Sequence, residues 1–88
     1  MTRYRRAAGV SATAVDQDLY LVHPASQEIY HLDAMAAALW RLLAEAQTEA
    51  ALTAAFAAAF PAVETARIDE DLAQALAGLV GPGLVIRD

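Results

Sequence analysis

Hydrophobic residues in this chain change from a spacing of about two to a spacing of about 3.6 near Leu32. Before that point, short runs of β-favouring residues are separated by turn residues, which predicts strands over residues 10–15, 19–22 and 27–32. Pro24, Ala25 and Ser26 supply the turn between the second and third of these strands. The pattern predicts a small antiparallel sheet followed by amphipathic helices.

The first helix is expected over residues 35–46, directly after Asp33. The Asp33 carboxylate can accept a hydrogen bond from a backbone N–H two or three residues later, and its charge suits the positive end of a helix. The apolar stripe of this helix, with Trp40 as its expected main anchor, consists of Leu32, Ala36, Leu39, Trp40 and Leu43.

Two further helices follow at the same spacing. Thr48 is expected to cap the second helix, and Pro61 is expected to end it, because proline lacks the helical N–H donor. The apolar stripe of the second helix is Leu52, Ala55, Phe56, Ala59 and Phe60. The third helix is expected to start between Val63 and Ala66 and to end at residues 81–83, with the stripe Ile68, Leu72, Leu76, Leu79 and Val80. Residues 84–86 are expected to form a last strand or an apolar plug.

Three strands followed by three helices form an α+β fold of the winged helix-turn-helix kind, with the wing placed first. Residues 9–88 are predicted to form a single domain, since 88 residues are near the lower size at which a chain buries enough apolar surface to fold alone. Residues 1–8, which include three arginines, are expected to be a flexible N-terminal segment.

Composition narrows the range of functions. The absence of cysteine excludes disulfides, thiolate nucleophiles and cysteine metal sites. The net charge of −5, with six scattered arginines as the basic residues, does not favour a nucleic-acid partner. No apolar run approaches the roughly 18 residues that a membrane span needs, and no signal-peptide core is recognisable, so we expect no membrane partner and a cytoplasmic location.

Few residues are candidates for metal binding or catalysis. His23, His31 and Asp33 lie near the predicted hairpin, but two histidines without a ligand-spacing motif favour a structural role over a metal site. Glu28, Asp33 and Glu45 form no recognisable acid–base pair. The sequence therefore predicts that the chain is not an enzyme.

The third predicted strand, residues 27–32, is expected at an edge of the sheet, where its unpaired backbone groups form a template for another extended segment. The acidic run at residues 69–71 is either a solvated helix face or the border of a groove for a positively charged segment. Ala75 is a small member of the third helix and could leave a shallow trough beside the strand. These features favour recognition of an extended peptide by strand addition.

The segment LYLVHPASQEIYHLDAMAAALWRLLAEAQTEAAL, followed by a helix ending at Phe60-Pro61 and another ending at GPGLV, resembles the PqqD-like proteins, also called RiPP recognition elements. The resemblance covers residues 9–86 and rests on order and spacing along the chain. It implies a non-catalytic domain, requiring no cofactor, that binds the leader region of a ribosomally synthesised precursor peptide. It also implies that the domain presents this peptide to a modifying enzyme, often a radical SAM protein.

The resemblance further implies that the leader adds as a strand to the third strand and lies against the third helix. Residues implied to pair through their backbone or to line that strand are Gln27, Glu28, Ile29, Tyr30 and His31. Helix-side contacts are implied for Asp71, Leu72, Ala75 and Leu79.

Two other classes of function stay open. A winged-helix DNA-binding protein needs a basic recognition helix, whereas the second expected helix is almost uncharged and the third begins with acidic residues. A structural or dimerisation subunit of a larger enzyme complex is also compatible with an open strand edge, and self-association into a homodimer is a related outcome.

Overall fold

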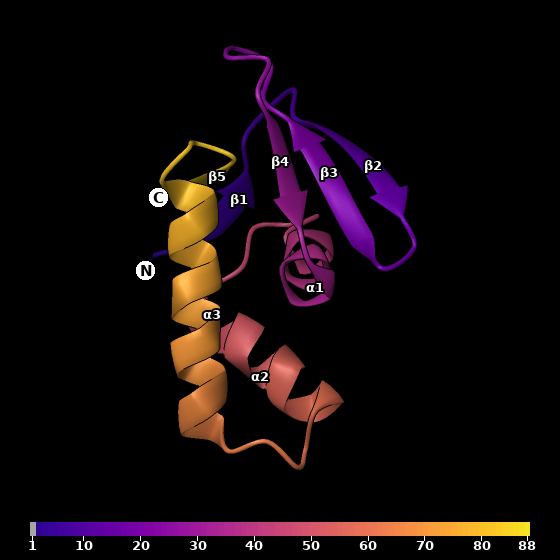
Figure 1. Cartoon of the computed structure of the whole chain (residues 1–88). Coiled ribbons are helices and arrows are strands. Elements are labelled where there is room, and N and C mark those ends of the chain that lie inside the picture. The colour runs from indigo at the N-terminus through magenta and orange to yellow at the C-terminus, as the bar shows by residue number, and fades with distance from the viewer. Residues whose placement is uncertain (1) are drawn as a thin grey trace.

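Five strands and three helices follow one another along residues 2–88, the part of the chain that the computed structural model describes (Figure 1). In chain order they are β1 (Tyr4–Arg6), β2 (Ser11–Val15), β3 (Asp18–Val22), β4 (Ile29–Leu32), α1 (Ala34–Leu42), α2 (Glu49–Ala59), α3 (Thr65–Val80) and β5 (Val85–Arg87). Strands β2, β3 and β4 form an antiparallel sheet in that order, and β1 pairs with β5 in a separate antiparallel ribbon. The α+β arrangement that the sequence predicts is confirmed.

The three-stranded sheet has one face against the helices and one face open to solvent. Strands β2 and β3 are joined by a tight turn in which Asp16 adopts a positive φ of 55°. Cross-strand neighbours share a face, so the paired residues Thr13, Tyr20 and His31 form one row on the outer side. In that row the Tyr20 and His31 rings lie 5.0 Å apart, and His31 Nε2 lies 2.7 Å from Asp18 Oδ2.

Polar side chains set where α1 and α2 begin, as the sequence predicts. The Asp33 carboxylate accepts a hydrogen bond from the Ala36 N–H at 2.9 Å, and the Thr48 hydroxyl accepts one from the Ala51 N–H at 3.1 Å. These side chains satisfy N–H groups that have no partner within the helix. Helix α2 ends at Ala59, two residues before Pro61, in agreement with the expected stop.

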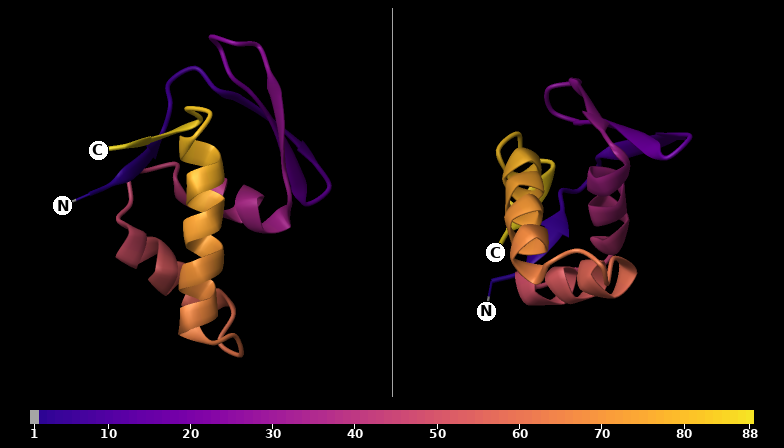
Figure 2. Two further views of the ribbon diagram at one scale, coloured as in Figure 1. Left: turned by 60° about the vertical axis from the view of Figure 1, so that its left-hand side comes forward. Right: turned by 60° about the horizontal axis from the view of Figure 1, so that its bottom comes forward.

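The three helices lie on one side of the sheet (Figure 2). One cluster of buried apolar side chains connects the sheet and the helices. Helix α1 packs against β3 and β4, and α2 packs against α3. Trp40 is 3% exposed and Leu39 is fully buried, which confirms the anchoring role expected for α1. Helix α3 buries Ile68, Leu72, Leu76 and Leu79 along its predicted stripe. Within residues 2–88, no helix is both long and apolar enough to cross a lipid bilayer.

Helix α1 ends at Leu42, four residues before the expected end at Ala46. The helix ends there because the backbone of Gln47 pairs with that of Tyr4 instead of continuing the helix. The two backbones exchange hydrogen bonds of 2.7 and 2.9 Å in an isolated bridge. Alanine and glutamate at positions 44–46 are good helix formers, so local helix propensity does not predict that α1 ends at Leu42.

The expectation of a flexible segment over residues 1–8 is wrong for Tyr4–Arg6, which form β1; Met1 lies outside the described residues. The Tyr4 side chain is buried in the core, and β1 pairs with β5. The Arg6 guanidinium donates to the Trp40 carbonyl at 2.6 and 3.0 Å and lies 4.7 Å from the Trp40 ring centroid. Partial burial lowers the pKa of Arg6. These contacts fix β1 in the fold, although its sequence shows little more than neighbouring arginines.

Phe60 also differs from its expected place in the core. Its side chain is 52% exposed, and its ring stacks on that of Phe56, with the centroids 6.3 Å apart. Because α2 stops at Ala59, Phe60 leaves the helical stripe and ends beside the core instead of within it.

Candidate functional site

Strand β4 is an open edge of the sheet, and its backbone alternates between bonding β3 and facing outward. The His23 N–H donates to the Glu28 carbonyl at 3.1 Å, and the register continues with Val22 opposite Ile29. In an antiparallel ladder every second residue is bonded to its neighbour, so Tyr30 and Leu32 bond to β3. The N–H and C=O groups of Ile29 and His31 therefore face the open edge.

The turn before β4 makes the strand shorter than the sequence predicts. Gln27 has a positive φ of 63°, and its N–H donates to the His23 carbonyl at 2.8 Å, so it belongs to the turn and not to the strand. Glu28 lies between the turn and β4, and its carbonyl accepts the hydrogen bond from the His23 N–H. Of residues 27–31, only Ile29, Tyr30 and His31 lie in the strand itself.

A groove runs along α3 and consists of two adjoining recesses: the upper one lies between α3 and β4, and the lower one lies between α3 and the start of α1. The upper recess, of about 230 Å³, is lined by Tyr30, His31, Leu32, Ala36, Ala75, Gly78, Leu79 and Leu84. The lower recess, of about 320 Å³, is lined by Asp33, Met35, Ala36, Asp71, Gln74 and Ala75. Ala36 and Ala75 belong to both, so the small side chains of α1 and α3 join the two recesses.

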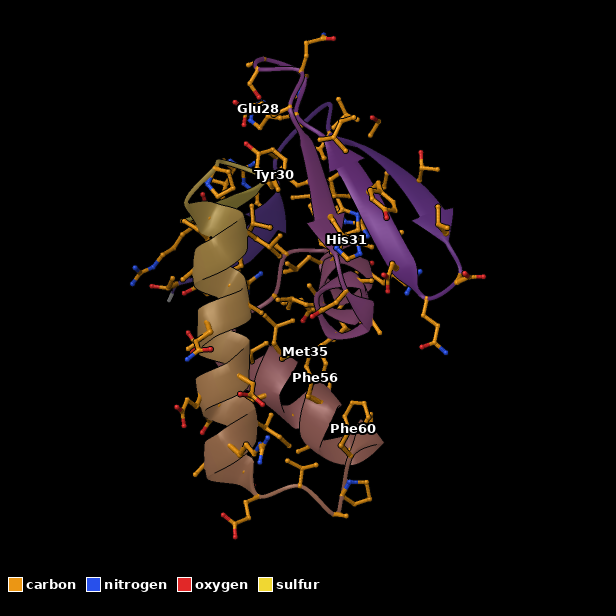
Figure 3. The ribbon with its side chains drawn as sticks, viewed as in Figure 1. Glu28, Tyr30, His31, Met35, Phe56 and Phe60 are labelled. Atoms are coloured by element: carbon orange, nitrogen blue, oxygen red, sulfur yellow. The ribbon has the colours of Figure 1, made fainter. Side chains whose placement is uncertain are left out.

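Tyr30 forms the upper wall of this groove, between β4 and the C-terminal turns of α3 (Figure 3). Its hydroxyl donates to the Glu28 carboxylate at 2.7 Å. This hydrogen bond is the main reason that the pKa of the Tyr30 phenol is raised, and partial burial and the Glu28 charge add to it. The ring is thus fixed at its tip by a carboxylate beside the mouth of the groove.

The lower recess is acidic. Among the described residues that line the two recesses, Asp33 and Asp71 are the carboxylates, and none is lysine or arginine. The Asp33 carboxylate caps α1. Asp71 forms an exposed ion pair with Arg67, in which Asp71 Oδ2 lies 3.8 Å from Arg67 Nε. Asp69, in the same acidic run, faces α2 and accepts a hydrogen bond from the Thr53 hydroxyl at 2.9 Å. Only part of the acidic run at residues 69–71 therefore borders the groove.

The structure brings most of the residues expected at the site together, with one exception on the helix. Ala75 and Leu79 line the upper recess opposite β4, and Asp71 lines the lower recess opposite the start of α1. Leu72 is fully buried in the core, although the family resemblance implied it as a helix-side contact. A residue in the middle of an amphipathic stripe packs inward. Leu79 is also buried, at 4% exposed, but it lines the upper recess, whereas Leu72 lines neither recess.

Gly78 is a lining residue that the sequence analysis missed. A Cβ atom built at this position meets no atom within 4 Å, so the missing side chain is itself part of the upper recess. Its position three residues after Ala75, on one face of α3, could have been recognised as a pair of small residues at helical spacing.

The histidines of the hairpin have structural partners. His31 Nε2 faces Asp18, and His23 Nδ1 accepts a hydrogen bond from the Ala25 N–H at 3.1 Å. No group of three or more metal-ligating side chains occurs within residues 2–88. Larger hollows, of about 500 and 630 Å³, lie beside Tyr4 and near Val63, and neither is lined by β4.

Known proteins share the sequence pattern and the fold of this chain. Residues 18–85 match the family described as "Coenzyme PQQ synthesis protein D (PqqD)". The chain belongs to the PqqD family. The matched region begins with β3 and extends to the start of β5, so the PqqD match includes β4, all three helices and the groove. No curated protein matches the chain.

A solved structure has a fold similar to that of this PqqD-family chain. The chain is similar to the structure named "TbiB1 in Complex with the TbiA(beta) Leader Peptide", with a TM-score of 0.82 and 23% sequence identity. The similarity covers 92% of this chain and 93% of TbiB1, so the fold is shared along nearly the whole length.

Proposed function

We propose that this chain is a non-catalytic peptide-binding protein that captures the leader region of a ribosomally synthesised precursor peptide by strand addition to β4. The observation that carries the proposal is the open β4 edge, with the outward backbone groups of Ile29 and His31, next to a groove along α3. His31 lines the upper recess of this groove, and the lower recess continues it toward the start of α1. Membership of the PqqD family, and similarity to a protein solved with a leader peptide, support the same assignment.

The groove supplies two kinds of interaction. Backbone hydrogen bonds to Ile29 and His31 give affinity for any extended segment, whereas the recesses select its side chains. Tyr30, Ala75 and Leu79 offer an apolar surface to a side chain that points toward α3. Asp71 is exposed at the lower recess, which favours a leader with a positively charged residue near that end.

The bound leader is then presented to a modifying enzyme, such as a radical SAM protein. Holding the leader on a domain that also contacts the enzyme converts a two-body encounter into a local search at a high effective concentration. This role requires no cofactor and no catalytic group from the chain itself.

The test is a titration of isotope-labelled protein with synthetic leader segments of precursor peptides encoded beside its gene, followed by backbone amide NMR. We expect shifts at Ile29 and His31 and along the groove side of α3. A Gly78→Leu variant places a side chain in the open upper recess and should weaken leader binding about tenfold or more.

Ala77→Leu is the matched control, because Ala77 is exposed and lines a hollow on the other side of α3. It should bind the leader as the unmodified protein does. Equal weakening by both variants, or leader-induced shifts confined to residues outside β4 and α3, would contradict the proposed groove.

A further inference from the structure

The second open edge of the sheet, at β2, differs from most edge strands. All five of its residues are exposed, on both faces of the sheet. Helix α1 lies beneath β3 and β4 (Figure 1). The inner side chains of β2, Ala12 and Ala14, are exposed. Edge strands of monomeric proteins usually carry a charge, a proline or a bulge that prevents pairing. Ser11–Val15 contains no charged residue and no proline, and its register with β3 is continuous.

We propose that two copies of this chain pair along their β2 edges as antiparallel strands and form a dimer. This proposal does not depend on leader binding, because it concerns the opposite edge of the sheet from β4.

The backbone of β2 presents the required groups. Residues 19, 21 and 23 of the β3 segment bond toward β4, so Asp18, Tyr20 and Val22 bond toward β2. Their partners in β2 are Val15, Thr13 and Ser11. The N–H and C=O groups of the two intervening residues, Ala12 and Ala14, therefore face the open edge.

The sequence of β2 is self-complementary about Thr13. Antiparallel pairing centred on Thr13 sets Ala12 of each copy opposite Ala14 of the other. The N–H and C=O groups that face the open edge in one copy then meet those of the other copy. Two such pairs exchange about four N–H···O bonds. The two Thr13 residues then form the closer, non-hydrogen-bonded pair, in which threonine hydroxyls can bond across the strands. This register gives the isologous contact that a two-fold dimer requires.

Charge also favours a second copy at this edge. Each chain carries a net charge of −5, so contact between two copies is least unfavourable along a neutral strip. Ser11–Val15 is such a strip. Asp16 lies just beyond it, and antiparallel pairing places the two Asp16 residues at opposite ends of the contact. Five-residue strands bury less surface than a standard interface of about 1,600 Å², so the dimer should be weak and readily reversible.

The test is sedimentation of the whole chain over a range of protein concentrations up to the millimolar level, without any peptide. We expect a reversible monomer–dimer equilibrium. Ala14→Pro removes an outward N–H that β3 does not use, and Thr13→Lys sets two like charges opposite each other. Each variant should raise the dissociation constant of the dimer about tenfold or more.

Two variants serve as controls. Ala14→Thr keeps the N–H and should still dimerise, and Ile29→Pro alters the β4 edge and should leave the dimer intact. Circular dichroism checks that each variant is folded. A protein that stays monomeric at millimolar concentration overturns the proposal. So does a dimer that survives both Ala14→Pro and Thr13→Lys, or one that Ile29→Pro abolishes, since that dimer would use another surface.

Discussion

The two edges of the same three-stranded sheet differ in what lies beside them. Strand β4 has α3 alongside, with an apolar recess between them that continues into an acidic recess between α3 and the start of α1. Strand β2 has no such wall, and all of its side chains are exposed. An edge with a wall can select the side chains of the strand that joins it, whereas a bare edge offers only its backbone and its own pattern. The first suits a peptide of defined sequence, and the second suits a copy of itself.

The largest effect is expected where both edges depend on the same core. Leu72→Glu buries a carboxylate at a fully buried position and should lower the free energy of unfolding by about 4 kcal/mol or more. We expect the variant to be largely unfolded and to lose leader binding and dimerisation together, as measured by circular dichroism and sedimentation. Leu72→Met keeps the volume and should retain both; a folded Leu72→Glu protein that lacks only leader binding would contradict the buried position.

Gly78→Leu should separate stability from binding at the groove. Glycine inside a helix costs about 1 kcal/mol relative to good helix formers, so the variant should melt at a higher temperature. The same side chain fills the upper recess and should weaken leader binding while the β2 dimer is unchanged. Thermal melts and a leader titration of the same sample measure the expected rise in melting temperature and the expected loss of affinity. A lower melting temperature would mean that the recess is not open.

Ile29→Pro removes one outward N–H from the β4 edge. The loss of one strand-addition hydrogen bond should weaken leader binding about three- to tenfold. Ile29→Thr keeps the N–H and removes the same exposed apolar side chain, so it isolates the contribution of the backbone. Fluorescence anisotropy with a labelled leader segment measures both; if Ile29→Thr weakens binding as much as Ile29→Pro, the side chain and not the backbone is responsible.

The smallest effect concerns the phenol at the groove wall. The pKa of Tyr30 is raised because its hydroxyl donates to Glu28, so its contribution to stability is full below the unfolded pKa of about 10. The contribution is lost as the pH rises through the higher pKa of the folded protein. Glu28→Gln should lower the pKa of Tyr30, followed by NMR of labelled tyrosine at alkaline pH.

The sequence predicts most of the fold because its main signals are local. The change in hydrophobic period near Leu32 separates strands from helices, and Asp33 and Thr48 cap helices as their side chains predict. Strand β1 could not be predicted in this way, because Tyr4 is buried through pairing with Gln47, which lies far along the chain. The early end of α1 has the same long-range cause.

The candidate site was predicted in outline and not in detail. An exposed edge and an amphipathic helix are visible as patterns, so β4 and α3 could be named together. Periodicity places Leu72 in the core stripe of α3, where the structure buries it, whereas the family resemblance implied it as a peptide contact. Neither signal indicates Gly78, because a glycine adds nothing to an apolar stripe. The positive φ of Gln27 depends on the whole turn, since glutamine has no special preference for that conformation.

The ribbon of β1 and β5 has a consequence for how the domain can be joined to other proteins. Tyr4 is paired with Arg87, so the chain enters and leaves the fold at neighbouring points (Figure 2). A host protein could therefore carry these residues as an insertion within one surface loop, because the insertion would not force the two ends of that loop apart. The same closeness would allow a short linker to circularise the chain, with new ends opened in the exposed turn at Asp16.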